Sequence, residues 1–186
     1  MGHRPYKDYS QFGEDEAVSC ILESIGETNR WCVEIGGHDG RQLSNTLMFR
    51  DRGWDCVLIE GEARHSDALN SLDGSPHVIL DYCTDLDLAL ATTPCPHDLD
   101  FISIDVDGQD YWLWHDMEIY RPRVVCIEYN PYENAPHYSA CNVIARGAVG
   151  QTAMAPLLAL AEEKGYSHMV TTYCNLIFVD KNAEVE

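Results

Sequence analysis

The sequence is poor in basic residues. It has 12 Lys and Arg against 31 Asp and Glu among 186 residues, which gives a formal net charge of -19 at pH 7. A surface with this charge repels phosphate backbones, so we do not expect nucleic acid as a partner or a substrate. The same imbalance predicts a strongly solvated surface and favours neutral or cationic small molecules as ligands.

Long apolar runs are missing as well. No segment approaches the roughly 20 apolar residues that a membrane-spanning helix needs, so we expect no membrane partner. Residues 1–10 are polar and charged, and they lack the apolar centre of a signal peptide. The length suits one domain that buries its own core. We therefore expect a single cytoplasmic domain over residues 1–186, of unknown oligomeric state.

Paired cysteine motifs are absent, although the sequence has eight cysteines. None of them forms C-x-x-C, the spacing typical of zinc ribbons and thioredoxin-like proteins. Cys32, Cys56 and Cys126 stand inside apolar runs, where a thiol packs as a small hydrophobic group. We expect eight free thiols, no disulfide and a reducing compartment.

Short apolar runs alternate regularly with longer amphipathic segments. The apolar runs are rich in Val and Ile, as is typical of buried strands, and lie at 31–36, 55–60, 77–80, 100–105 and 123–128. Helical segments are expected at 14–25, 42–52, 62–71, 85–92 and 109–119. This order predicts parallel βαβ units in a Rossmann-like α/β fold with helices on both faces of the sheet.

The C-terminal part follows another pattern. A helix expected at 151–164 ends at Gly165, and two strand-like runs follow at 167–172 and 175–179. Their two-residue separation is typical of a hairpin, so we expect seven strands that end in an antiparallel hairpin. The longest irregular segment, 130–150, follows the end of a strand, and we expect it to contribute to a substrate site.

A glycine-rich turn, E-I-G-G-H-D-G, spans Glu34 to Gly40 directly after the first expected strand. Gly36, Gly37 and Gly40 permit a tight turn and a close approach of the backbone to a ligand. Glu60 ends the second expected strand, about 20 residues further on, where an acid can accept hydrogen bonds from both hydroxyls of a ribose. This combination indicates a nucleoside-containing cofactor.

A complete G-x-G-x-x-G motif is missing, because Asp39 stands between His38 and Gly40. Glu34 lies inside the strand and would place a negative charge near the pyrophosphate of a dinucleotide. The same carboxylate could hold the amides of the turn or the amino group of a methionine moiety. Both features favour S-adenosylmethionine (SAM) over NAD.

Several motifs resemble those of FkbM-type methyltransferases. They are S-Q-F-G-E-D at 10–15, the glycine turn, S-N-T at 44–46, W-x-x-x-L-I-E at 54–60, D-F-I-S-I-D-V-D-G-Q-D-Y at 100–111 and R-P-R-V-V-C-I-E-Y-N at 121–130. The motifs occur in the family's order and cover nearly the whole chain. The resemblance implies the seven-stranded methyltransferase fold and SAM-dependent O-methylation, often of sugars or secondary metabolites.

The resemblance also implies roles for single residues. Glu34, Gly36 and Gly40 would line the methionine end of SAM, Glu60 would hold the ribose, and Asp81 would lie near the adenine. The turn departs mildly from the family's D-I-G-A pattern, since Gly37 replaces the alanine and Glu34 the aspartate.

Oxygen-bearing side chains follow the fourth and fifth expected strands. Asp105 and Asp107 end one of them, and Glu128 and Asn130 end the other. Four converging oxygen ligands could hold Mg²⁺ or Ca²⁺, which would lower the pKa of an acceptor hydroxyl. Alternatively, one carboxylate is a general base without a metal, or Asp107 and Asp110 only cap the next helix. Asp105 also lies at the edge that faces the expected cofactor.

His38 is a further catalytic candidate, because it lies in the turn beside the expected cofactor. His137, in the long irregular segment, is a weaker one. Together these features predict a SAM-dependent methyltransferase that acts on an oxygen of a small polyhydroxylated or phenolic acceptor. Two other functions stay open: a SAM- or nucleoside-binding module without transfer activity, and a nicotinamide-dependent enzyme.

Overall fold

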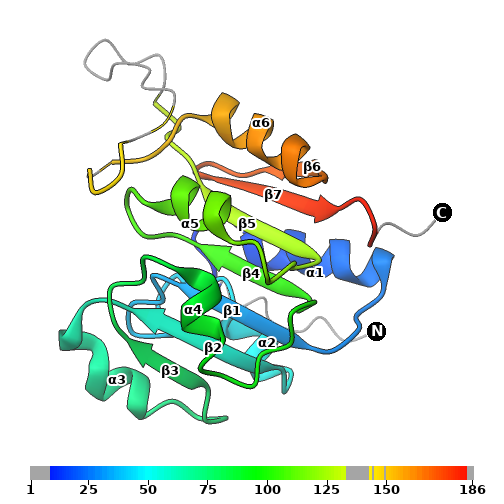
Figure 1. The fold of residues 1–186 in the computed structure, drawn as a ribbon. Helices are drawn as coiled ribbons and strands as arrows, with labels where there is room; N and C mark the ends of the chain where they lie inside the picture. Colours follow the sequence, from blue (N-terminus) through cyan, green and yellow to red (C-terminus); the bar gives the residue numbers. More distant parts are fainter. Residues whose placement is uncertain (1–8, 133–142, 144, 149, 184–186) are drawn as a thin grey trace.

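A seven-stranded sheet forms the centre of the computed structural model, which describes residues 9–132, 143, 145–148 and 150–183 (Figure 1). The strand order is β3-β2-β1-β4-β5-β7-β6. The strands are β1 Trp31–Ile35, β2 Asp55–Glu60, β3 His77–Leu80, β4 Phe101–Ile104, β5 Val124–Glu128, β6 Tyr166–Thr171 and β7 Asn175–Asp180. The first five run parallel, whereas β7 pairs antiparallel with both β5 and β6. The predicted Rossmann-like fold with a C-terminal antiparallel hairpin is confirmed.

Helices cover both faces of this sheet (Figure 1). One face packs against α1 Glu14–Ile25, α2 Leu47–Asp51 and α3 Ser66–Asn70. The other packs against α4 Leu86–Leu90, α5 Asp110–Asp116 and α6 Met154–Lys164. Side chains of a strand point alternately to the two faces, so β1 sends Val33 and Ile35 to the second face and Cys32 to the first.

Two expected helices are shorter in the structure because side chains capture their backbone amides. The helix expected at 42–52 begins only at Leu47, since Glu34 binds the segment 44–46. The helix expected at 109–119 ends at Asp116, and the amides of residues 118–120 donate instead to the carboxylate of Asp87, at 2.7–3.1 Å. Both segments leave the helix for hydrogen bonds that only the folded chain supplies.

Other boundaries shift less. The segment 62–71 divides into a 3₁₀ turn, Ala63–His65, and α3, and the helix expected at 151–164 begins at Met154. None of the helices in the described ranges is long and apolar enough to cross a membrane. The seven described cysteines are free thiols, and Cys141 lies outside the described residues.

Candidate active site

A cavity of about 820 Å³ opens at the carboxyl ends of the parallel strands. Most of its lining comes from the ends of β1, β2, β3 and β4 and the segments that follow them, and includes Gly36, Glu60, Asp81 and Asp105. The order of the strands reverses between β1 and β4, and ligands of open α/β sheets bind at such a switch point. The volume lies in the range of small-molecule sites.

Gly36 and His38 of the glycine turn line this cavity, whereas Gly37 and Gly40 are buried and lie outside its lining. Gly36 has φ +79°, and a Cβ there would lie 1.6 Å from the carbonyl oxygen of Asp105, so this position requires glycine. Gly40 has φ +71°, and a Cβ there would lie 2.6 Å from Leu72 Cδ1. At Gly37 the nearest atoms would be 3.7 Å away, so a methyl group fits. Two glycines therefore shape the turn, and the third is interchangeable with alanine in size.

Glu60 connects the end of β2 to the glycine turn. Its carboxylate accepts hydrogen bonds from the backbone N–H of His38 and of Glu62, each at 2.7 Å. A carboxylate has further lone pairs, and the residue lines the cavity. Glu60 is thus held in place and can still accept from ribose hydroxyls. Asp81, after β3, is exposed and lines the same half of the cavity.

Glu34 takes a position other than the expected one. Its buried carboxylate accepts from Ser44 Oγ at 2.7 Å, Asn45 N–H at 2.7 Å and Thr46 Oγ1 at 2.6 Å. Burial raises its pKa, and these donors oppose the shift. Glu34 does not line the cavity, whereas Asn45 does. In the structure the glutamate orders the S-N-T segment, and it holds no amide of the glycine turn among the described residues.

His38 lies in the cofactor half of the cavity. Its backbone is left-handed, with φ 49°, and its ring packs against that of His65 with the ring centres 3.9 Å apart. The side chain is half exposed. It is therefore suited to lining a bound ligand, and it belongs to a wall separate from the carboxylates that end β4 and β5.

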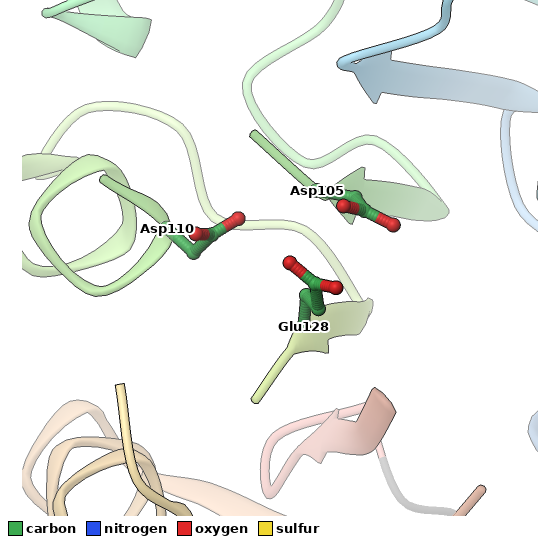
Figure 2. A group of neighbouring side chains, drawn as sticks. All are labelled: Asp105, Asp110 and Glu128. Carbon is green, nitrogen blue, oxygen red and sulfur yellow. The ribbon is translucent and has the colours of Figure 1, made fainter. Parts of the chain in front are cut away.

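Three carboxylates meet beside the carboxyl ends of β4 and β5. Figure 2 shows Asp105, Asp110 and Glu128 directed toward one another, and one oxygen of each lies within 4.8 Å of the others. Asp105 follows β4, Glu128 ends β5, and Asp110 opens α5. Asp105 reaches the cavity, while Asp110 and Glu128 are buried behind it. We refer to these three residues as the acidic cluster.

Within the acidic cluster, Asp110 also orders the turn between β4 and α5. Its oxygens accept from the backbone N–H of Val106 at 2.8 Å and of Gly108 at 2.9 Å. These bonds close the turn between β4 and α5. Burial raises the pKa of Asp110 to about 6, although both amides oppose the shift. Asp110 thus orders the turn before α5 and belongs to the cluster. The alternative in which Asp107 and Asp110 only cap the helix is not observed, because the N-cap residue is Gln109 and no described side chain caps this helix.

Glu128 is incompletely satisfied. Oε1 accepts from Gln151 Nε2 at 2.9 Å, but Oε2 is buried and has no hydrogen-bond partner among the described residues. Burial and the adjacent Asp105 raise the pKa of Glu128, and burial with Asp110 and Asp107 raises that of Asp105. Two close carboxylates in such a place bind a proton or a cation between them, because both cannot ionise cheaply.

The expected set of Asp105, Asp107, Glu128 and Asn130 is therefore corrected. Asp107 has φ 57°, and its exposed side chain lines the cavity outside the cluster. Asn130 Oδ1 accepts from the N–H of Tyr132 at 2.8 Å, in a turn of its own. Asp110 takes their place, because the D-G-Q turn reverses the chain and returns the first residue of α5 to the strand ends.

Further cavity residues were missed by the sequence reasoning. Gln11, Asn45, Gln109 and Asn175 supply side-chain amides to the lining. The motif S-Q-F-G-E-D contains Gln11 and was a usable signal. Asn175, at the start of β7, had none. Of the long segment 130–150, residues 133–142, 144 and 149, with His137 among them, lie outside the described residues.

No protein-family model and no curated protein matches this sequence. Solved structures do resemble it. An O-methyltransferase from Bacillus cereus in complex with SAH is 17% identical with TM-score 0.55, and the alignment covers 94% of this chain and 84% of that one. A SAM-dependent methyltransferase from Clostridium acetobutylicum is 6% identical with TM-score 0.57, over 91% and 92% of the two chains.

A third similar structure is geranyl diphosphate C-methyltransferase from Streptomyces coelicolor, in complex with Mg²⁺, geranyl diphosphate and S-adenosyl-L-homocysteine. It is 13% identical with TM-score 0.52, over 90% of this chain and 79% of that one. At such identities the likeness concerns the fold, and the resemblance to FkbM-type proteins in particular depends on the motifs alone. The chain has the Rossmann-like fold of SAM-dependent methyltransferases.

Proposed function

We propose that this protein is a SAM-dependent O-methyltransferase of a small-molecule acceptor. One observation carries the proposal: a single cavity joins a glycine turn and its adjoining acid, Glu60, to a buried carboxylate cluster with raised pKa values. The first half suits a nucleoside cofactor, and the second suits removal of a proton from an acceptor. A simple binding module has no need of the second half.

The cofactor half offers a contact for each part of SAM. Gly36 and His38 of the glycine turn line the cavity and would contact the methionine end, and Glu60 would accept hydrogen bonds from the ribose. Asp81 also lines the cavity, and the resemblance implies that it lies near the adenine. Bound SAM supplies the chemistry of a methyl group on a sulfonium. The protein's task is to align an acceptor oxygen with that group and to exclude water.

The acidic cluster provides the proton acceptor. Asp105 is the member that reaches the cavity, so it is the base for an acceptor hydroxyl. Glu128 lies behind it, with an oxygen within 4.8 Å of an oxygen of Asp105, and Gln151 fixes the orientation of Glu128. Because the pair has raised pKa values, it holds a proton more tightly than ordinary carboxylates do.

A divalent cation is the alternative occupant of the cluster. Carboxylate oxygens suit Mg²⁺ and Ca²⁺, and oxygens that lie within 4.8 Å of one another can bind one ion. Asp105, Asp110 and Glu128 would hold the ion, which would lower the pKa of an acceptor hydroxyl. Activity that EDTA removes and Mg²⁺ or Ca²⁺ restores would assign a cation, whereas EDTA-resistant activity assigns the carboxylate base.

Calorimetric titration with SAM, SAH and NAD tests the cofactor. We expect SAM and SAH to bind and NAD not to bind. Glu60→Ala should weaken SAM binding by about 1–3 kcal/mol, because it removes the acceptor for buried ribose hydroxyls. Glu162→Ala, an exposed site on α6, is the matched control. Binding of NAD alone, or unchanged SAM affinity in Glu60→Ala, would contradict this cofactor site.

A further inference from the structure

Three aromatic side chains from distant parts of the chain gather on the surface. Phe12, Tyr132 and Tyr173 are 43%, 51% and 50% exposed. The ring centres of Phe12 and Tyr173 are 4.9 Å apart, and those of Tyr132 and Tyr173 are 6.2 Å apart. The two tyrosine hydroxyls form a hydrogen bond of 2.6 Å. We call these three residues the aromatic rim. Contiguous exposed apolar groups of this kind mark binding sites.

The aromatic rim adjoins the cavity and the acidic cluster. Gln11 and Asn175 line the cavity. Gln11 directly precedes Phe12, and Asn175 follows Tyr173 by two residues. Asn175 is also the register partner of Glu128 across β5 and β7. The rim therefore lies beside the strand end that carries the acidic cluster, on the side away from β2 and the glycine turn.

A buried carboxylate holds the rim together. Glu14 is fully buried and accepts from Phe12 N–H at 2.8 Å, Thr172 Oγ1 at 2.6 Å and Asn175 Nδ2 at 3.3 Å. These bonds tie the segment before α1 to the turn between β6 and β7. The exposed rings are thus preorganised, which reduces the entropy that a ligand must offset on binding.

We propose that the aromatic rim binds the ring of a phenolic methyl acceptor and directs its hydroxyl to Asp105. The inference rests on the proposed function. The rings meet at 46° and 79°, the tilted and edge-to-face arrangements that a further aromatic ring can join. Arg64, after β2, is the one Lys or Arg among the described cavity-lining residues. On the rim side, the described lining of the cavity therefore has no Lys or Arg to pair with a phosphate or carboxylate of the acceptor.

The acidity of the acceptor favours the same class. A phenol has a pKa of about 10, whereas water, which resembles an aliphatic hydroxyl, has a pKa of about 15.7. A phenol therefore gives its proton to a carboxylate much more readily than a sugar hydroxyl does. The proton passes from the phenol to Asp105. The phenolic oxygen forms the new bond to the methyl carbon, and the sulfur retains the electron pair of the bond that breaks.

Fluorine NMR with 4-fluorophenol tests this site directly, with and without SAH. We expect the wild-type protein to broaden the 4-fluorophenol signal in a saturable way and to leave 3-deoxy-3-fluoroglucose unaffected. Tyr173→Ala should weaken 4-fluorophenol binding about three- to tenfold, the effect of one lost aromatic contact. Tyr173→Phe keeps the ring and should bind as the wild type does. Leu88→Ala, 69% exposed on α4, is the matched surface control.

Equal binding of 4-fluorophenol by wild type and Tyr173→Ala would overturn the inference, as would saturable binding of the fluoroglucose in preference to the phenol. Thermal unfolding of each variant, measured beside the titration, establishes that the site is compared between folded proteins. If SAH does not bind while the phenol still distinguishes wild type from Tyr173→Ala, the proposed function fails and the aromatic site stands.

Discussion

The two ends of β4 carry aspartates in opposite circumstances. Asp100, before the strand, is fully buried and accepts from the amides of residues 28–30, from Thr28 Oγ1 at 2.6 Å and from Arg123 Nη1 at 2.9 Å. Burial opposes its ionisation, but these donors outweigh burial and lower its pKa. Asp105, after the strand, faces other carboxylates, and burial raises its pKa. Of the two aspartates, only Asp105 is suited to act as a general base.

Asp100 supports the fold, whereas Asp105 is available for chemistry. The carboxylate of Asp100 accepts hydrogen bonds from the loop between α1 and β1, so its ionised form stabilises the native state. Asp105 lies at the edge where a parallel sheet binds ligands, and its carboxylate lies close to those of Glu128 and Asp110. Unsatisfied acidic groups destabilise a fold, and proteins retain them mainly at functional sites.

Asp105→Asn should give the largest effect, on activity. We expect transfer of a labelled methyl group from SAM to a phenolic acceptor to fall about 10²- to 10⁴-fold, because the amide cannot take the proton. SAM affinity should stay within about threefold, since the change lies on the acceptor side. Asp55→Asn, exposed at the start of β2, is the control. Full turnover in Asp105→Asn would make the acidic cluster structural.

Asp100→Ala should give the largest effect on stability. Arg123 and the amides of residues 28–30 would lose a buried acceptor, at a cost of about 3–5 kcal/mol. Urea unfolding at pH 7 measures this loss. The same measurement on Asp105→Asn should show no destabilisation, because one of several repelling charges is removed. Equal losses in both variants would contradict the division of roles between the two ends of β4.

Glu128→Gln should give a smaller effect that depends on pH. Burial and Asp105 raise the pKa of Glu128 above its ordinary value of 4.5. Its contribution to stability is therefore complete below pH 4.5 and is lost as the pH rises through the raised value. Glutamine stays neutral, so the variant avoids this loss.

The melting temperature of Glu128→Gln relative to wild type should therefore rise between pH 5 and pH 9, by an amount equivalent to about 1–2 kcal/mol. Glu162→Gln, an exposed site, should give a difference independent of pH. A constant difference for Glu128→Gln would mean that Glu128 ionises as an ordinary carboxyl does.

Much of the fold could be predicted because its signals are local. Five valine- and isoleucine-rich runs and two further strand-like runs located the seven strands to within one residue at every end, and the two-residue gap at 173–174 predicted the hairpin. Gly36 and Gly40 were identified from the turn, and their positive φ values explain why glycine stands there. Such features depend on residues close together in the chain, so the sequence expresses them directly.

The helix at 42–52 shows where local signals fail. Its N-terminal half is polar and could start a helix, but Glu34 of β1 binds Ser44, Asn45 and Thr46 in a segment of turns and bends. Three hydrogen bonds to a buried carboxylate outweigh the weak preference of a few residues for helix. No pattern within the segment contains that information, because the partner lies on another element.

The sequence by itself determined the order of strands and helices, the glycine turn with Glu60 after it, and the gathering of acids at the ends of β4 and β5. The tertiary structure decided which oxygens meet. Asp110 joins Asp105 and Glu128 while Asp107 and Asn130 turn away, since the left-handed backbone at Asp107 and the turn at Asn130 redirect their side chains. The aromatic rim also exists only in the folded chain. Its members are distant in sequence, and the packing of α1 against β5 and β7 brings them together.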